Sequence, residues 1–189
     1  MAFFAPEELH FDDVVVRCWR PGDGPAFAES VRLSYDHLSP WMAWAKADVT
    51  DEDGEDYARR CHAKYLSNED FPMGIWRSNQ VIGGTGFHLR RGSLDSGCAE
   101  LGMWIAGSVA GQGLGSRVLE NLLAWSFTEW PWHRLEWRCD PVNVASWKVA
   151  ERNGLHLEGT LRDNILQAGV RRSTRVYSLL RPEWHARPA

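Results

Sequence analysis

A glycine-rich segment, Ala110-Gly111-Gln112-Gly113-Leu114-Gly115-Ser116, constrains the fold more than any other stretch of this chain. It follows an apolar run, residues 101–105, that predicts a buried strand. It precedes a segment with apolar residues at i, i+3, i+4 and i+7, which predicts an amphipathic helix. Glycines allow positive φ angles and close backbone approach, and the first N–H groups of a helix lack partners within the helix. This order of elements predicts an anion site, and a pyrophosphate is the favoured anion.

The residues missing from this segment exclude two familiar phosphate sites. A P-loop needs a lysine after its last glycine, but Gly115 is followed directly by Ser116. A dinucleotide-binding turn needs a third glycine where Ser116 stands, and an acidic residue about 20 residues further on at the end of a second strand. The remaining alternative is a glycine-rich turn that only starts a helix.

Length and composition exclude several classes of protein. A chain of 189 residues predicts one domain, and a net charge of −4 argues against a nucleic-acid partner. The sequence starts without the regions of a signal peptide, and no apolar run reaches the ~18 residues of a membrane span. We therefore expect a cytoplasmic protein without a membrane partner. The four cysteines are isolated and the histidines lack ligand spacing, so no metal site is expected.

Hydrophobic periodicity predicts the order of the elements. Strands are expected at residues 14–19, 71–77, 80–89, 98–105, 133–139, 157–166 and 170–180. One helix capped by Asp23 is expected to carry Phe27, Val31 and Leu38, and further helices are expected to start near residues 50, 114 and 144. Turns at residues 78–79 and 168–169 predict two hairpins. The fold class is therefore mixed α/β, with a mixed, mostly antiparallel central sheet and helices on both faces.

The glycine segment resembles the acetyl-CoA signature of the GNAT N-acetyltransferases, Arg/Gln-x-x-Gly-x-Gly/Ala, with Ala110 in place of Arg or Gln. Other motifs resemble the RimJ/RimL-type branch, which acetylates the N-termini of ribosomal proteins. They are Pro40-Trp41-x-x-Trp44, the strand at 99–105, Asp140-Pro141-x-Asn143-x-x-Ser146, Asn153-Gly154-Leu155 and the segment 157–162. Their order extends the resemblance over residues 12–181. It implies a single GNAT domain, residues 1–189, with the acyl-CoA N-acyltransferase fold.

The resemblance implies acetyl-CoA as the acyl donor and indicates the residues that bind it. The backbone of Met103, Trp104 and Ile105 is expected to pair with the pantetheine arm. The N–H groups that hold the pyrophosphate are expected to come from Gly111, Gln112, Gly113, Leu114, Gly115 and Ser116, aided by the helix dipole. Asn143 matches a family asparagine that hydrogen-bonds the pantetheine region. Its alternative role is a helix N-cap.

Acetyl transfer to an amine needs a group that accepts the amine proton and a group that protonates the departing thiolate. Ser146 is the candidate acid by resemblance, because the RimL-type branch has a serine there. Many GNAT enzymes use a tyrosine where this chain has Ala150. Glu100 is the candidate base, on the strand that adjoins the donor and in an expected apolar setting. The alternatives are a helix-start serine and a water-facing carboxylate, and Glu136 and Asp163 are weaker candidate bases.

Aromatic residues are expected to wall the acceptor pocket. Trp41, Trp44 and Tyr57 are suited to contact a cationic amine through their ring faces, and core packing is their alternative role. The acidic run at residues 48–56 predicts a solvated helix start that also suits a cationic acceptor.

The sequence therefore predicts an acetyl-CoA-dependent N-acetyltransferase that transfers the acetyl group directly to a primary amine in a ternary complex. A protein or peptide N-terminus is the favoured acceptor, and a homodimer is compatible with the resemblance. Cys139 is the one residue worth testing as an acyl-carrying nucleophile. Two alternatives remain open: transfer to a small-molecule amine, and an inactive CoA-binding module that acts as a sensor or partner. Ala110 and Ala150 favour the inactive module, whereas Glu100 and Ser146 oppose it.

Overall fold

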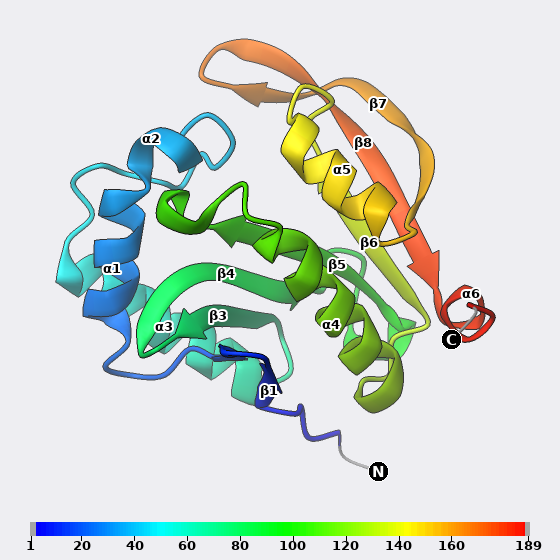
Figure 1. The fold of residues 1–189 in the computed structure, drawn as a ribbon, viewed down its shortest axis with the longest axis horizontal. Helices are drawn as coiled ribbons and strands as arrows, with labels where there is room; N and C mark the ends of the chain where they lie inside the picture. The colour runs from blue at the N-terminus through cyan, green and yellow to red at the C-terminus, as the bar shows by residue number, and fades with distance from the viewer. Residues whose placement is uncertain (1–2, 188–189) are drawn as a thin grey trace.

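A single sheet forms the centre of the computed structural model, which describes residues 3–187. Within these residues, eight strands lie in the order β1-β2-β3-β4-β5-β6-β8-β7 (Figure 1). The strands are β1 Glu8–Phe11, β2 Val14–Cys18, β3 Phe71–Arg77, β4 Gln80–His88, β5 Cys98–Ile105, β6 Arg134–Cys139, β7 His156–Gln167 and β8 Val170–Leu180. Neighbours are antiparallel except β5 and β6, which are parallel. The predicted mixed, mostly antiparallel sheet is confirmed.

Helices cover both faces of the sheet, as predicted. In the described part of the chain they are α1 Gly24–Leu33, α2 Tyr35–Leu38, α3 Asp51–Leu66, α4 Leu114–Glu129, α5 Val144–Arg152 and α6 Arg181–His185. On one side, α1 and α3 bury Phe27, Val31 and Ala58 against Trp19 and Trp104. On the other side, α4 contributes fully buried residues to a second cluster: Val118, Leu119, Leu122 and Leu123.

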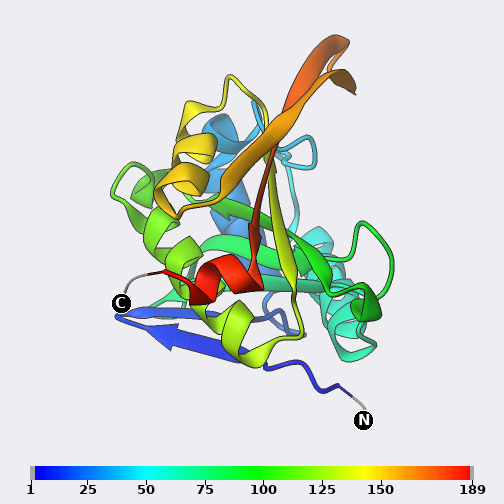
Figure 2. The ribbon, with the colours of Figure 1, turned by 90° about the vertical axis from the view of Figure 1, so that its right-hand side faces the viewer.

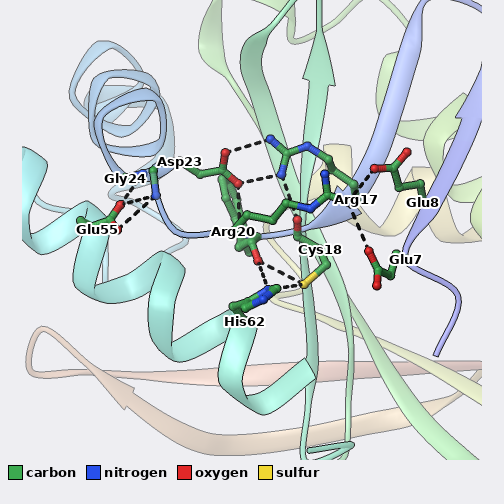
Figure 3. Close-up of polar contacts among 11 residues, drawn as sticks. Glu7, Glu8, Arg17, Cys18, Arg20, Asp23, Gly24, Glu55 and His62 are labelled. Atoms are coloured by element: carbon green, nitrogen blue, oxygen red, sulfur yellow. Dashed lines mark hydrogen bonds and ion pairs between the residues drawn. The ribbon is translucent and has the colours of Figure 1, made fainter. Parts of the chain in front are cut away.

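Two helix starts are stabilised in different ways. Thr50 caps α3 in a capping box: its hydroxyl accepts a hydrogen bond from the Asp53 N–H at 3.0 Å, and the Asp53 carboxylate accepts one from the Thr50 N–H at 3.0 Å. The predicted start near residue 50 is confirmed. Asp23 is the N-cap residue of α1 as predicted, but its side chain makes no capping hydrogen bond, because its carboxylate accepts two hydrogen bonds from Arg17, at 2.7 and 2.8 Å (Figure 3).

Other elements depart from the sequence pattern. The helix expected to run from Phe27 to Leu38 is two helices, because α1 ends at Leu33 and α2 begins at Tyr35. The pattern predicts neither β1 nor α6. β1 is a four-residue edge strand with half-exposed side chains, so it lacks the buried residues that make a strand visible in a sequence.

Glycines let α1 and α3 approach each other closely. A Cβ atom at Gly54 would collide with the carbonyl oxygen of Gly24, and one at Gly24 would collide with the backbone of Glu55. The Glu55 carboxylate accepts hydrogen bonds from the N–H groups of Gly22 at 2.9 Å and Gly24 at 3.4 Å (Figure 3). These contacts fix α1 against α3 on the sheet face that carries Trp104.

The parallel pair β5–β6 divides the sheet into two halves. β5 and β6 are paired only from Cys98 opposite Arg134 to Leu101 opposite Trp137. Beyond Leu101, β5 continues to pair with β4 but not with β6, so its other edge is open over residues 102–105. The second half ends in the long β7–β8 hairpin, which extends beyond the rest of the molecule (Figure 2).

No helix within residues 3–187 is both long enough and apolar enough to cross a membrane. In the same range, His, Cys, Asp and Glu side chains do not gather in threes as a metal ion would need.

Candidate active site

The open edge of β5 and the glycine segment line one groove, here called the donor groove, with a volume of about 310 Å³. Its lining includes predicted donor-binding residues: Met103, Trp104, Ile105, Gly111, Gly113, Leu114, Gly115, Ser116 and Asn143. Gln112 is the exception, because it lies outside the lining and its side-chain amide donates to the Ser108 carbonyl at 3.5 Å.

The turn before α4 has the geometry of an anion cradle. Gly111 and Gly113 adopt φ angles of 76° and 78°, and Gly113 is the N-cap residue of α4. A Cβ atom at either glycine would have no atom within 4 Å among the described residues, so the space above the turn is open. Since no described side chain caps α4, its first N–H groups are available to a ligand. The site fits a pyrophosphate.

A second groove, here called the acceptor groove, has a volume of about 630 Å³ and lies on the α1–α3 side of β4 and β5. The structure places Trp41, Trp44 and Tyr57 in its wall. Trp44 packs edge-on against Trp104 with 5.9 Å between ring centroids, and Tyr57 stacks on Phe27 at 4.4 Å. Trp44 and Tyr57 therefore line the groove and also pack against core rings, so their two expected roles are compatible.

The two grooves meet at a common wall. Seven residues line both of them: Trp41, Met42, Met103, Trp104, Trp137, Asn143 and Ser146. A donor bound along β5 and an acceptor bound along the glycine-lined floor, Gly84 and Gly102, would therefore meet at this wall. Both Ser146 and Asn143 lie at this junction.

Ser146 is oriented by two hydrogen bonds. Its hydroxyl oxygen accepts a hydrogen bond from Trp137 Nε1 at 3.1 Å, and its backbone N–H donates to Asn143 Oδ1 at 3.2 Å. Asn143 is thus the N-cap of α5, as its alternative role predicts. Since the indole N–H occupies one lone pair of the Ser146 oxygen, the hydroxyl proton is available to another acceptor.

Cys139 lies beside the same junction. Burial raises the pKa of its thiol above the ordinary value, and the nearby Ser146 opposes the rise only in part. The thiol form is inert, because the thiolate is the nucleophile. The environment of Cys139 therefore disfavours an acyl-enzyme route.

Glu100 lines the acceptor groove but not the donor groove. Its carboxylate is 3.8 Å from Arg90 and 3.9 Å from Arg138. The expected apolar setting is wrong, because β6 pairs in parallel with β5 and brings Arg138 alongside. Glu136, a weaker candidate, is 4% exposed and is paired with Arg134 at 3.0 Å, which suits a structural role.

Asp163, the other weaker candidate, lies in an irregular, exposed part of β7 and is not among the residues that line either groove.

Sequence reasoning missed two polar residues of the acceptor groove. Arg172 of β8 donates to the Pro40 carbonyl at 3.1 Å and to Asp140 at 3.2 Å, and its guanidinium lies 5.9 Å from the Trp41 ring centroid. It thereby joins β8 to the loop that carries Trp41. The two residues in contact are 132 positions apart, so no local sequence pattern could predict this contact. His88 also lines the groove. The antiparallel pairing of β4 with β5 places His88 opposite Glu100, and this pairing is the signal that could have located it.

A groove that fits a CoA-type pyrophosphate and adjoins a second groove is an arrangement that an acyltransferase requires. Residues 13–156 match the profile of the acetyltransferase (GNAT) domain family, and the chain belongs to this family. Its members are acetyl-CoA-dependent N-acetyltransferases, so the predicted enzyme class is confirmed. The chain is 26% identical over 176 residues to "Putative ribosomal N-acetyltransferase YdaF" of Bacillus subtilis (strain 168), covering 92% of this chain and 94% of the relative.

Solved structures share the fold. RimL, a ribosomal L7/L12 alpha-N-protein acetyltransferase in complex with coenzyme A, superposes with a TM-score of 0.84 and 20% identity, covering 92% of this chain and 98% of that chain. The Microcin C7 self immunity acetyltransferase MccE, in complex with acetyl-CoA and AMP, gives a TM-score of 0.83 and 17% identity, covering 90% and 93%. The predicted GNAT fold is confirmed.

Proposed function

We propose that this enzyme transfers the acetyl group to the α-amine at the N-terminus of a protein or peptide, directly and in a ternary complex. The acceptor groove carries the proposal. Its volume, about 630 Å³, is about twice that of the donor groove. Trp44 and Tyr57 line it from one half of the sheet, and Ile165 and Arg172 line it from the other. An extended chain end fits so large a groove better than a single small amine does.

The names of two similar proteins support this acceptor class. YdaF is named as a ribosomal N-acetyltransferase, and RimL acts on the α-amine of a ribosomal protein. MccE supports the rival class, a small-molecule acceptor, because it was solved with AMP beside acetyl-CoA.

Bound acetyl-CoA supplies the activated acetyl thioester. Residues 102–105 offer unpaired backbone groups to its pantetheine amides, and the N–H groups at the start of α4 hold its pyrophosphate. Asn143 uses Oδ1 to cap α5, which leaves Nδ2 to donate to a ligand, so its two candidate roles are compatible. Ser146, at the junction, donates its hydroxyl proton to the departing thiolate.

An acceptor panel tests the proposal. Peptides with a free α-amine, the same peptides N-terminally blocked but containing lysine, and small polyamines are compared by thiol release and mass spectrometry. We expect acetylation of the free α-amine and none of the blocked peptides. Acetylation of small amines alone would refute the peptide assignment. Slow hydrolysis of acetyl-CoA that no amine stimulates would indicate the inactive sensor.

A further inference from the structure

An Asp70–His88 pair lies beside the acceptor groove, with only His88 in the groove lining. Nδ1 of His88 lies 3.0 and 3.1 Å from the two carboxylate oxygens of Asp70. Both side chains are 20% exposed. Asp70 immediately precedes β3 and His88 is the last residue of β4, so the strands fix both ends of the pair. His88 itself lines the groove.

Two glycines make room for the imidazole ring. Gly86 and Gly102 are directly opposite each other on β4 and β5. A Cβ atom at Gly102 would lie 2.9 Å from Nε2 of His88, and one at Gly86 would lie 3.3 Å from Cε1. The ring edge that carries Nε2 therefore lies over Gly102. The next residue in the chain is Met103, which belongs to the wall shared by both grooves.

The pairing with Asp70 sets the tautomer of the neutral ring. Burial alone would raise the pKa of Asp70, but its hydrogen bond with His88 and the positive charges of Arg90 and Lys64 lower it below its ordinary value, so the carboxylate is ionised at neutral pH. An ionised carboxylate only accepts hydrogen bonds, so Nδ1 carries the proton. Within residues 3–187, the hydrogen bonds of His88 use Nδ1 alone. Nε2 therefore presents its lone pair to the groove.

The charged and titratable groups around the pair come from several elements. Glu100 of β5 lies opposite His88 in the sheet register, and Arg90 and Arg138 lie 3.8 and 3.9 Å from its carboxylate. Three groups of α3 are coupled to Asp70: burial first, and then the charge of Asp70, raise the pKa of Tyr57 and of Cys61, and the charge of Lys64 lowers the pKa of Asp70. An ammonium in the groove would thus have the Glu100 carboxylate on one side and the free Nε2 on the other.

We infer that His88, oriented by Asp70, is the base that accepts the proton of the acceptor ammonium, and that Glu100 attracts that ammonium by charge. Nε2 takes one proton, and the lone pair of the neutral amine forms the C–N bond to the acetyl carbon. The C–S bond breaks with its electron pair on sulfur, and a second amine proton reaches the thiolate by way of Ser146. The proton on His88 then passes to water. The inference rests on the N-acetyltransferase activity and not on the class of acceptor.

A pH profile of kcat/KM tests this assignment. In the wild type, the imidazole deprotonates the bound ammonium, so the rate reaches its plateau below the pKa of the free amine, about 8 for an α-amine. In His88→Gln the amine must arrive neutral. We expect a loss of about 10²-fold at pH 7 that shrinks above pH 8. Asp70→Asn should show the same trend with a smaller loss, and Glu100→Gln should raise KM for the acceptor without moving the profile.

His62→Gln is the matched control. His62 is a partly buried histidine whose Nδ1 bonds the Trp19 carbonyl at 2.8 Å, and it lines neither groove (Figure 3). It should keep the wild-type profile. A His88→Gln variant with an unchanged profile overturns the inference, as does a profile that moves only in Glu100→Gln. Calorimetry of acetyl-CoA binding and circular dichroism verify folding, and Asp70→Asn serves if His88→Gln does not fold.

A second measurement is independent of turnover. ¹⁵N NMR of the neutral His88 ring should show the proton on Nδ1, and the opposite tautomer would overturn the inference. If the wild type acetylates small amines only, the proposed acceptor class is wrong and the variants are compared on that amine. If it acetylates no amine, the variants are compared in basal hydrolysis of acetyl-CoA, where water needs the same base. An unchanged His88→Gln rate there contradicts the assignment.

Discussion

The anion cradle before α4 gives the most quantitative prediction. Gly113 holds φ at 78°, a conformation that costs an L-residue about 1–2 kcal/mol. In Gly113→Val the free turn relaxes away from this strained conformation, and ligand binding must restore it. A difference of 1–2 kcal/mol corresponds to a factor of about 5–30 in an equilibrium constant. We therefore expect the dissociation constant for acetyl-CoA, measured by calorimetry, to rise about 5- to 30-fold.

Gly169 provides a matched control for backbone strain. It has the same φ angle of 78°, and a Cβ atom there would likewise have no described atom within 4 Å. It lies in the turn of the β7–β8 hairpin and does not line the donor groove. Gly169→Val should lose similar thermal stability and keep wild-type affinity for acetyl-CoA. Equal affinities in the two folded variants would refute the cradle.

Three further predictions concern other sites. Ser146→Ala should lower kcat about 10²-fold with little change in acetyl-CoA affinity, and a kcat within about twofold of wild type would leave Ser146 as a helix-start serine. Arg172→Ala should raise KM for the acceptor, because it frees the loop that carries Trp41; a KM equal to wild type would contradict this. The hydrogen bond from Arg134 lowers the pKa of Glu158 from 4.5 to about 2. The ionised Glu158 carboxylate therefore stabilises the folded state fully above pH 4.5, and this contribution is lost as the pH falls toward 2. The Tm difference between wild type and Glu158→Gln should shrink over that range, and a constant difference would count against it.

Local patterns predicted the elements that position the donor. The strand Cys98–Ile105 has its predicted bounds, and the turn at 78–79 joins β3 to β4 as predicted. Both signals are local, since alternating burial and paired positive φ angles act over a few residues. The nine donor-groove residues that were predicted follow from this strand, the glycine turn and the asparagine of the next helix.

The acceptor side was harder to predict, because tertiary contacts build it. Asp70 and His88 are 18 residues apart, and only the β3–β4 hairpin brings them together. The setting of Glu100 depends on Arg138, which arrives through the parallel crossover between β5 and β6. The sequence pattern identified Glu100 as a polar residue on a buried strand, but it contained no information on which charges face it.

The short β5–β6 pairing has a mechanical consequence. Within residues 3–187, four residue pairs, Cys98–Arg134 to Leu101–Trp137, are the backbone ladder that joins one half of the sheet to the other. Past Leu101 the two strands separate, and the edge of β5 that faces β6 is unpaired along residues 102–105. The amide groups of a pantetheine chain bound along that edge would add hydrogen bonds to the backbone of β5. A bound donor would therefore make the junction between the two halves of the sheet more rigid. Hydrogen exchange at the amides of residues 102–105 and 138–139 should then be slower with the donor bound than without it.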